Sequence, residues 1–433
     1  MRRLTTREPA WSAFLADLRG RTAGDLWKAE EAVRPILEAV RVEGDAALFG
    51  YARQFDGASL DATTVRVAPA EIRQAVERIP AAALAALRLA AERTEAFHRR
   101  QVRTSWFWED TGAILGQLWR PLRRVGVYIP GGRAAYPSTV LMTAIPARVA
   151  GVREVVLCSP AGPEGTVHPG LLVAADLAGV GEVYRVGGAQ AVAAMAYGTA
   201  SVPAVDKIVG PGNIYVTAAK RLLYGLVGID MLAGPTEILV LADGSANARC
   251  AAADLLSQAE HDPLSAAILL TPSAALAAAV AREVEAQAAA RPRRAVIAEC
   301  LARYGAVVVV RDLAEAVEVA NAIAPEHLEI LAEDPWALLP GLTNAGAIFL
   351  GHATPESVGD YVAGPSHVLP TGGSARYQSG LGVEDFMTRS SLVRFTPGKL
   401  REVGGAVMAL ADLEGLEAHG HALAVRLDGG EAE

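Results

Sequence analysis

The feature of this sequence that most constrains its fold is an alternation of short apolar runs with helix-like stretches. It starts near residue 124, after about a hundred residues with a largely helical pattern, and continues to about residue 380. The apolar runs lack a polar face, which is typical of strands in a parallel sheet covered by helices. The strand–helix order therefore predicts an α/β fold. The runs of the first block are 154–160, 182–188 and 206–213, and each precedes a helical stretch.

A second block of the same texture begins at EILVLAD, residues 237–243. Further apolar runs follow, separated by helical stretches, at 266–272, 306–310, 327–333 and 345–351. We therefore predict two α/β units with parallel-type sheets. No sequence repeat relates the two blocks, so the sequence does not indicate a duplication. Beyond about residue 380 the alternation ends, and we expect a short, mainly helical C-terminal segment.

Length and composition indicate the class of protein. The chain has 433 residues, of which 52% are hydrophobic and 20% charged, as is ordinary for a globular protein of several domains. The net charge of −8 argues against nucleic acid as a partner, because proteins that bind it usually carry a basic patch. No apolar run reaches the roughly 18 residues that a membrane-spanning helix needs. The N-terminal stretch also lacks the pattern of a secretory signal, so we expect a cytoplasmic protein without membrane contact.

The three cysteines do not predict a catalytic or metal-binding role. Cys158, Cys250 and Cys300 are odd in number, far apart and flanked by apolar or small residues. This setting is typical of reduced structural thiols in a cytosolic protein. No CxxC pair occurs, so we do not expect a zinc site built from thiolates.

Polar residues gather near the end of a predicted helix in DLLSQAEHDP. Gln258 and His261 have i, i+3 spacing, which puts them on one helix face together with Asp254. An imidazole beside a side-chain oxygen forms a plausible pair of metal ligands. Helix ends also carry polar residues without such a role, so the residues alone leave both interpretations open.

A carboxylate and an imidazole are adjacent where a predicted helix gives way to a strand. Glu326 and His327 follow Pro325, which ends the helix and restricts the local backbone. An imidazole titrates near neutral pH and burial can tune a carboxylate, so the pair can serve as acid and base. A solvated turn is the alternative that this pattern leaves open.

Two further histidines have carboxylate neighbours. Asp360 and His367 lie in ESVGDYVAGPSHVLPTGG, a long stretch rich in glycine and proline, and such long loops tend to be functional. Glu414 and His419 lie in the C-terminal helical segment. We expect His419 either to have no special role or to complete a site across an interface.

Three glycine-rich turns follow predicted strands, in IPGGRAAYPS, RVGGAQAVAA and VGPGN. Glycine lets the backbone approach a ligand closely, and a following helix N-terminus can face a phosphate. No GxGxxG motif occurs, which argues against a standard Rossmann phosphate turn. Three such turns in one block favour a nucleotide crevice, with ordinary tight turns as the alternative.

Eight motifs in order along the chain resemble the histidinol dehydrogenase family. The resemblance extends from about residue 25 to 427, and an ordered set of this size is far more specific than any single motif. The motifs are YIPGG, STVLMTAIPA, VGGAQA, VGPGN, AGPTE, DLLSQAEHD, APEHLE and EGLEAHGHA.

The resemblance implies an activity and its cofactors. The family oxidises L-histidinol to L-histidine through L-histidinal with two NAD⁺, as the final step of histidine biosynthesis. Its members are homodimers with shared active sites and one Zn²⁺ per subunit. By this resemblance Glu326 and His327 are the acid–base pair, His327 removing the alcohol proton and Glu326 activating water in the second oxidation. The zinc is expected to orient the substrate.

The same resemblance assigns the remaining site residues. Metal ligands and substrate contacts overlap, and His327 itself also contacts substrate. Thr236 stands where family members often have serine, so its hydroxyl is kept while its geometry is in doubt. His367 lies near the substrate-contact motifs without a defined role. The implied zinc ligands are Gln258, His261, Asp360 and, from the other subunit, His419; the implied NAD⁺ contacts are Tyr128, Gln190 and Asn213; the implied substrate contacts are Thr236, Gln258, His261, His327, Asp360, Glu414 and His419.

The fold expected from pattern and resemblance together is two incomplete Rossmann-like domains flanked by small helical segments. We expect an N-terminal helical segment at 1–24 and a C-terminal one at 382–433 that completes the partner subunit's site. The first α/β domain is expected to combine 25–127 with 237–381 and to carry the metal and catalytic residues. Residues 128–236 are expected to form the second, NAD-binding domain.

Two other functions compete with this hypothesis. A related zinc- and NAD-dependent dehydrogenase could act on another polar alcohol, such as a sulfonated diol. Glu414 argues against that substrate, because a carboxylate suits a cationic amino alcohol and repels a sulfonate. A zinc hydrolase without nucleotide would use Gln258, His261, Asp360 and Glu326, but it would leave the three glycine turns without a role.

Overall fold

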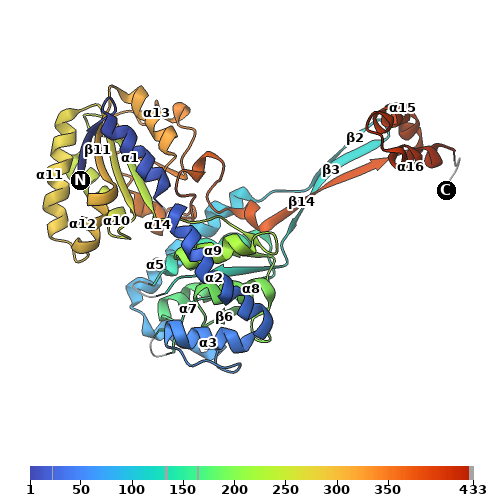
Figure 1. The fold of residues 1–433 in the computed structure, drawn as a ribbon, viewed down its shortest axis with the longest axis horizontal. Helices are drawn as coiled ribbons and strands as arrows, with labels where there is room; N and C mark the ends of the chain where they lie inside the picture. Colours follow the sequence, from blue (N-terminus) through green and yellow to red (C-terminus); the bar gives the residue numbers. More distant parts are fainter. Residues whose placement is uncertain (22, 132–134, 163–164, 429–433) are drawn as a thin grey trace. The chain divides into compact units, whose positions relative to one another are not determined.

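The computed structural model describes residues 1–21, 23–131, 135–162 and 165–428 (Figure 1). The chain divides into two compact units, which we call the larger and the smaller unit. The larger unit comprises residues 1–101 and 122–386, and the smaller unit comprises 102–121 and 387–433. Within the described ranges, no helix is both long enough and apolar enough to cross a membrane.

The first sheet of the larger unit has six strands in its described part, all parallel, in the order β1-β11-β10-β9-β12-β13. Counted from β9, the first strand of its block, the order is 3-2-1-4-5 with β1 added at the edge. This is the order of doubly wound α/β sheets, one strand short of the full set. The strands are β1 (Arg2–Thr5), β9 (Glu237–Ala242), β10 (Ala266–Thr271), β11 (Gly305–Val309), β12 (His327–Leu331) and β13 (Ala347–Leu350).

Alternate residues of β9 face two hydrophobic cores. Ile238 and Val240 pack with α10, α11 and α12, whereas Leu239 and Leu241 pack with α1 and α13. Burial on both faces explains why the apolar runs have no polar side. The helices around this sheet are α1 (Pro9–Gly20), α10 (Ala248–Ala259), α11 (Ala274–Ala289), α12 (Arg294–Tyr304), α13 (Leu313–Ile323) and α14 (Glu356–Tyr361).

The second sheet of the larger unit is also parallel, with five described strands in the order β6-β5-β4-β7-β8. It has the same 3-2-1-4-5 order when counted from β4. The chain reverses its direction of travel across the sheet after β6, so right-handed crossovers put the later helices on the opposite face from the earlier ones. The strands are β4 (Arg124–Tyr128), β5 (Glu154–Cys158), β6 (Glu182–Tyr184), β7 (Lys207–Val209) and β8 (Gly228–Ile229), and the connecting helices are α6 (Pro137–Ala150), α7 (Pro169–Ala178), α8 (Gly188–Tyr197) and α9 (Ile214–Leu223).

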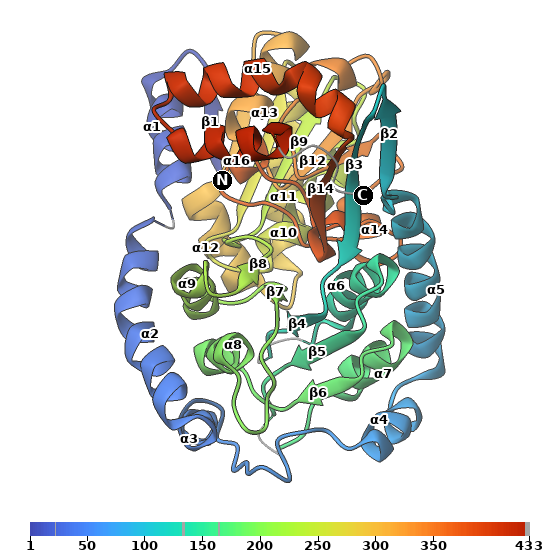
Figure 2. The ribbon, with the colours of Figure 1, turned by 90° about the vertical axis from the view of Figure 1, so that its right-hand side faces the viewer.

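The N-terminal helices pack against this second sheet. Val33 and Leu37 of α2 and Leu48 of α3 share one hydrophobic core with α8 and α9, and α2 runs beside both of these helices (Figure 2). This differs from the predicted grouping of 25–127 with 237–381, because the amphipathic pattern of a helix does not say which sheet it covers. The helices before β4 are α2 (Ala23–Glu43), α3 (Asp45–Asp56), α4 (Pro69–Ala75) and α5 (Ala81–His98).

The predicted α/β fold with parallel sheets is confirmed, and both ends of the chain contain the expected helices, but each end also contains a strand that was not predicted. Residues Arg2–Thr5 lie in a strand that pairs with β11, although this region was expected to be helical. Residues Met387–Phe395 also form a strand, β14, where a helical segment was expected. Both strands are recruited by partners distant in the sequence, and such pairing overrides local propensity.

The smaller unit contains an antiparallel sheet in the order β14-β3-β2 and a helical hairpin. The hairpin between β2 and β3 turns at Thr111 and Gly112, which both have positive φ, as a tight two-residue turn requires. The two helices of the helical hairpin pack against each other, and Gly404 of the first and Gly420 of the second are buried. Its elements are β2 (Trp106–Asp110), β3 (Ala113–Pro121), β14, α15 (Pro397–Leu413) and α16 (Glu417–Asp428).

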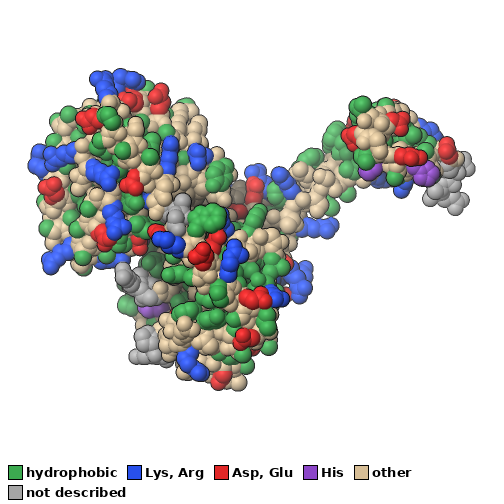
Figure 3. All heavy atoms as spheres, in the orientation of Figure 1, with side chains coloured by type: hydrophobic (Ala, Val, Ile, Leu, Met, Phe, Trp, Pro, Cys, Tyr) green, Lys and Arg blue, Asp and Glu red, His purple; other side chains and the backbone are tan. Residues whose placement is uncertain are grey.

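Short 3₁₀ helices join several of these elements, at η1 (Val76–Arg78), η2 (Arg99–Gln101), η3 (Leu339–Gly341), η4 (Ser374–Arg376) and η5 (Val383–Phe386). Acidic and basic side chains are interspersed on the face of the larger unit that is in view in Figure 3. This mixing is typical of a solvated surface rather than of a single electrostatic field.

Candidate active site

The predicted acid–base pair lies at the start of β12, beside the start of β9. His327 is the first residue of β12 and pairs in register with Ile238 of β9. Ala324, just upstream, has φ +52, and this left-handed residue ends α13. Because parallel strands begin at the same edge of a sheet, the local sequences around Glu326 and Glu237 meet there.

Glu326 is buried and accepts several hydrogen bonds. Its Oε2 accepts from the Thr236 hydroxyl and, at 2.9 Å, from the backbone N–H of Glu237. Its side chain has 9% of its surface exposed. Burial raises the pKa of Glu326 above its usual range, against the opposing effect of His327 and these donors. A carboxyl group in this environment can exchange a proton near neutral pH.

His327 has its two ring nitrogens in different environments. Nδ1 lies 2.9 Å from the backbone carbonyl oxygen of Glu237. A carbonyl oxygen only accepts, so Nδ1 carries the proton of this bond. Nε2 is buried, lacks a hydrogen-bond partner among the described residues and lies 3.7 Å from Oδ1 of Asp360. Burial lowers the pKa of His327, but the carboxylates of Glu326 and Asp360 outweigh it and raise this pKa.

A group with metal-binding geometry surrounds Nε2 of His327. One ligand atom each of His327, Glu356 and Asp360 lies within 4.8 Å of the others. Burial opposes ionisation of Asp360, but His327 and His367 hold its pKa well below the usual range. Oε1 of Glu356 is buried and has no hydrogen-bond partner among the described residues. Glu356 was not predicted from the sequence, although its i, i+4 spacing to Asp360 on α14 could have indicated it.

Of the predicted pair Gln258 and His261 at the end of α10, only Gln258 contacts the residues of this site in the described part of the chain. Gln258 is buried, and its Oε1 lies 2.7 Å from the Thr236 hydroxyl oxygen. This hydroxyl has one proton, so it donates to either Gln258 or Glu326 at a given time. His261 lies just beyond the helix and is exposed. Partial desolvation lowers the pKa of His261, while the charge of Asp360 raises it and that of His327 lowers it further. His261 does not belong to the possible metal-binding group formed by His327, Glu356 and Asp360. Thr236 therefore joins Gln258 to Glu326 through its hydroxyl.

His367, for which no role was predicted, lies in the loop after α14 and contacts both α14 and α6. Its Nδ1 lies 3.0 Å from the backbone carbonyl oxygen of Asp360, and its Nε2 lies 2.8 Å from the Thr139 hydroxyl. Burial lowers the pKa of His367, which favours the neutral ring. In that form Nδ1 donates to the carbonyl and Nε2 accepts from Thr139. This histidine therefore connects Asp360 to the first turn of α6.

The predicted nucleotide contacts lie at the carboxyl end of the second sheet. Tyr128 ends β4, Gln190 lies in the first turn of α8, and Asn213 is the N-cap of α9. The ends of β4 and β7 mark the point where the strand order reverses, the usual binding place in such sheets. The Tyr128 hydroxyl accepts from the backbone N–H of Gly188 at 3.0 Å. Both amide atoms of Gln190 are buried and have no hydrogen-bond partner among the described residues.

Glu414 and His419 lie in the smaller unit. Glu414 follows the last turn of α15, and His419 lies in the first turn of α16. Both are exposed. The sequence prediction that they serve the site of a second subunit stays a prediction.

Comparison with known proteins identifies the family. The sequence model described as Histidinol dehydrogenase matches residues 19–427. The chain is 55% identical to the histidinol dehydrogenase of Synechococcus sp. over 92% of each chain. It is 51% identical to that of Thermosynechococcus vestitus over 99% of this chain and 100% of the relative.

The chain belongs to the histidinol dehydrogenase family. This confirms the resemblance inferred from the ordered motifs. Its fold agrees with the crystal structure of histidinol dehydrogenase from Elizabethkingia anophelis, with a TM-score of 0.88, 38% identity and 92% coverage of both chains. Thus, the site at the start of β9 and β12 is that of a histidinol dehydrogenase homologue.

Proposed function

We propose that this chain is an L-histidinol dehydrogenase, which oxidises L-histidinol through L-histidinal to L-histidine with two NAD⁺ in the final step of histidine biosynthesis. Besides family membership, the observation that carries the proposal is the different environment of the two ring nitrogens of His327. Its Nδ1 is bonded to a carbonyl, and its unpartnered Nε2 faces Asp360 beside the buried Glu326.

The first oxidation requires a base for the alcohol proton. His327 is our candidate, because Nε2 carries the free lone pair when Nδ1 donates to Glu237. The carboxylates around His327 favour its protonated form, so a cation bound beside Asp360 would help to return it to the neutral form. NAD⁺ supplies the hydride acceptor.

The second oxidation requires water to add to the aldehyde. Glu326 is our candidate for deprotonating that water, since burial raises its pKa toward the range in which a carboxylate acts as a base near neutral pH. Thr236 and the backbone N–H of Glu237 both bond to Oε2, which orients the carboxylate. His327 is then available for the proton of the hydrate.

The residues of the site fit a zinc ion. Buried atoms that have no hydrogen-bond partner among the described residues include Nε2 of His327 and Oε1 of Glu356, and zinc accepts nitrogen and oxygen ligands. Gln258 would bind the ion through its carbonyl oxygen Oε1, because its amide nitrogen only donates hydrogen bonds. We propose Gln258, His261 and Asp360 as ligands of one Zn²⁺ per subunit, with His419 of the partner subunit as the fourth. When bound, zinc orients the amino alcohol.

We propose that NAD⁺ binds at the carboxyl end of the second sheet, with Tyr128, Gln190 and Asn213 as contacts. The buried, unpartnered amide of Gln190 supports this placement. The substrate would contact Thr236 and His327 and, from the second copy, Glu414 of the partner subunit. Free thiols at Cys158, Cys250 and Cys300 and the use of NAD⁺ agree with a cytoplasmic enzyme.

Exposed aromatic side chains on the smaller unit support a homodimer with shared sites. Trp106, Phe107 and Trp108 of β2 have 49%, 71% and 51% of their surface exposed. The two tryptophans lie on one face of the strand and Phe107 on the other, and exposed apolar side chains of this size favour an interface. Mixing two inactive variants, His327→Asn and His419→Asn, should restore part of the activity if sites are shared. No recovery after confirmed subunit exchange would refute the sharing.

The test of the function is NADH formation, followed by its absorbance, when the purified zinc-loaded protein receives NAD⁺ and L-histidinol. We expect two NADH per histidinol consumed and L-histidine as product. The variant His327→Asn serves as the inactive control. Turnover of a sulfonated diol but not of histidinol would assign the other dehydrogenase, and hydrolytic activity without NADH would indicate the hydrolase.

A further inference from the structure

The backbone of Glu237 contacts both members of the acid–base pair. Its N–H donates to Oε2 of Glu326 at 2.9 Å, and its carbonyl oxygen accepts from Nδ1 of His327 at 2.9 Å. These bonds set the direction of the Glu326 carboxylate and the orientation of the His327 ring. Any shift of the Glu237 peptide would therefore move both reactive groups together.

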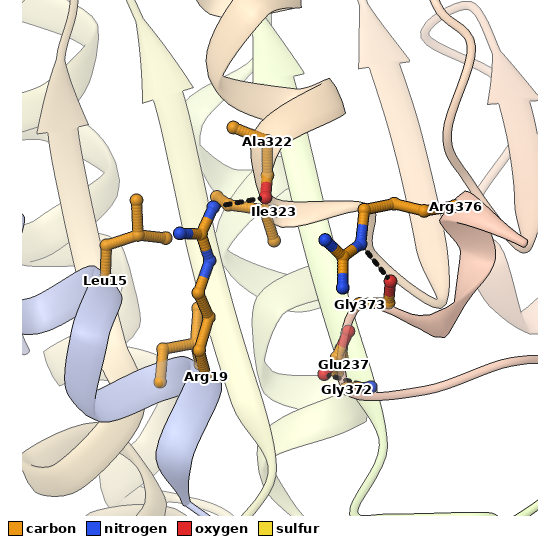
Figure 4. Close-up of a pocket in the computed structure, with 9 residues that line it drawn as sticks. Leu15, Arg19, Glu237, Ala322, Ile323, Gly372, Gly373 and Arg376 are labelled. Atoms are coloured by element: carbon orange, nitrogen blue, oxygen red, sulfur yellow. Dashed lines mark hydrogen bonds between the residues drawn. The ribbon is translucent and has the colours of Figure 1, made fainter.

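The side chain of Glu237 forms hydrogen bonds that hold this peptide in place. It is buried, and its Oε2 lies 3.3 Å from the backbone N–H of Glu326, which donates to it. Its Oε1 accepts from the backbone N–H of Gly372 at 2.9 Å and from the guanidinium of Arg21. Figure 4 shows this carboxylate and Gly372 beside Arg376 in a cavity of about 200 Å³.

Arg21 directly follows α1, and its hydrogen bond to Glu237 connects the end of this helix to the start of β9. Its side chain is 2% exposed, and it also donates to the backbone carbonyl oxygen of Pro235 at 2.9 Å. Its guanidinium lies 5.7 Å from the centre of the Tyr304 ring. Nε and Nη1 of Arg21 are buried and have no hydrogen-bond partner in the described part of the chain. Glu237 therefore supplies the compensating charge for a buried cation, and losing it would be costly.

We propose that Glu237 is a positioning residue for Glu326 and His327, and that Arg21 holds its carboxylate in place. The inference rests on the proposed function for its kinetic consequences. Glu237 makes three hydrogen bonds to the acid–base pair and one to the loop at Gly372. The geometry of the reaction therefore depends on a residue that is not one of the proposed substrate contacts. A displacement of the order of one ångström at a reacting group costs about 10²-fold in rate.

The test compares Glu237→Gln with the double variant Arg21→Met, Glu237→Gln. The single variant leaves Arg21 buried without its counter-charge, and the double variant removes the whole ion pair. Glu71→Gln is the matched control, because Glu71 likewise accepts from an arginine, Arg185, and from a backbone N–H, that of Ala68. The measurements are kcat, the KM for NAD⁺ and the midpoint of thermal unfolding.

We expect Glu237→Gln to lower kcat by about 10- to 100-fold through misplacement of the pair, while the KM for NAD⁺ stays within about twofold because the nucleotide site is elsewhere. The double variant should recover thermal stability but keep the low kcat. The control should lose stability at most. Recovery of kcat in the double variant, or an unchanged kcat in Glu237→Gln, would show that Glu237 is only one half of a structural ion pair.

A measurement without substrate separates this inference from the proposed function. In protein labelled with ¹⁵N at histidine, the Nδ1 proton of His327 should give a resolved signal, because it is buried and hydrogen bonded. The signal is assigned by its loss in His327→Asn. We expect Glu237→Gln to broaden it by exchange with water and Glu71→Gln to leave it unchanged. An unaltered signal in Glu237→Gln would overturn the inference even if histidinol were not the substrate.

Discussion

The imidazole of His327 donates through Nδ1 to the backbone carbonyl oxygen of Glu237 at 2.9 Å. The other nitrogen then faces Asp360 without a hydrogen-bond partner in the described part of the chain. This bond assigns the two ring nitrogens to separate tasks, one structural and one available for chemistry. It also joins β9 to β12 at the point where the acid–base pair begins.

Thr236 tests whether a hydroxyl is needed between Gln258 and Glu326. We expect Thr236→Val to lower kcat/KM by about 10- to 100-fold, because it removes a hydrogen bond to a buried carboxyl group, worth about 1–3 kcal/mol. Thr236→Ser keeps the hydroxyl and should stay within about threefold of the parent. Steady-state kinetics check this, and an unchanged kcat/KM in Thr236→Val would contradict the need for the hydroxyl.

His419 tests the zinc ligand set. We expect His419→Asn to lower the zinc content of the purified protein, because an amide is a weaker ligand than an imidazole. Metal analysis after dialysis measures it, with His421→Asn, two residues further along α16, as the control. Full zinc occupancy in His419→Asn would remove this residue from the set.

Asp56 makes stability depend on pH. Partial burial raises its pKa from 3.8 to about 6, so the folded state binds a proton more tightly than the unfolded state. The stabilisation due to Asp56 is present in full below pH 3.8 and is lost as the pH rises through about 6. We expect Asp56→Asn to unfold at a higher temperature than the parent at pH 7 and to lose this advantage near pH 4. Thermal unfolding across this range checks it, and a constant difference would contradict the assignment.

Lys220 and Asp230 bond to both sides of one glycine, Gly210, beside the proposed nucleotide site. The Lys220 ammonium donates to the carbonyl oxygen of Gly210 at 2.9 Å, and Asp230 accepts from the N–H of Gly210 at 2.7 Å. Gly210 has φ +109, so the turn depends on glycine. We expect Lys220→Met to raise the KM for NAD⁺ by about tenfold or more through loosening of this turn. The neighbouring variant Arg221→Met is the control, and equal KM values in the two variants would contradict the role of Lys220.

The sequence predicted the parallel sheets because two-sided burial produces apolar runs without a polar face. It did not predict β1 (Arg2–Thr5), since four residues with two arginines carry no strand pattern and become a strand only by pairing with β11. It also could not assign α2 and α3 to the second sheet, because an apolar helix face fits either sheet.

The candidate site was predictable only where side chains carry the chemistry. Glu326 and His327 are adjacent in the sequence, and their types indicate acid–base chemistry. Glu237 was not predicted, because its contacts to the acid–base pair are made largely by its backbone and its side chain forms a buried ion pair. No sequence motif encodes such contacts. Glu356 was missed although it shares a short helix with Asp360.

In the proposed mechanism, Glu326 and His327 divide the two oxidations between them. The most direct test measures Glu326→Gln separately with L-histidinol and with L-histidinal, as NADH formed in single turnovers. We predict that the alcohol step retains most of its rate while aldehyde oxidation falls by about 10²-fold or more, the range of general base catalysis. An equal fall in both steps would contradict this division.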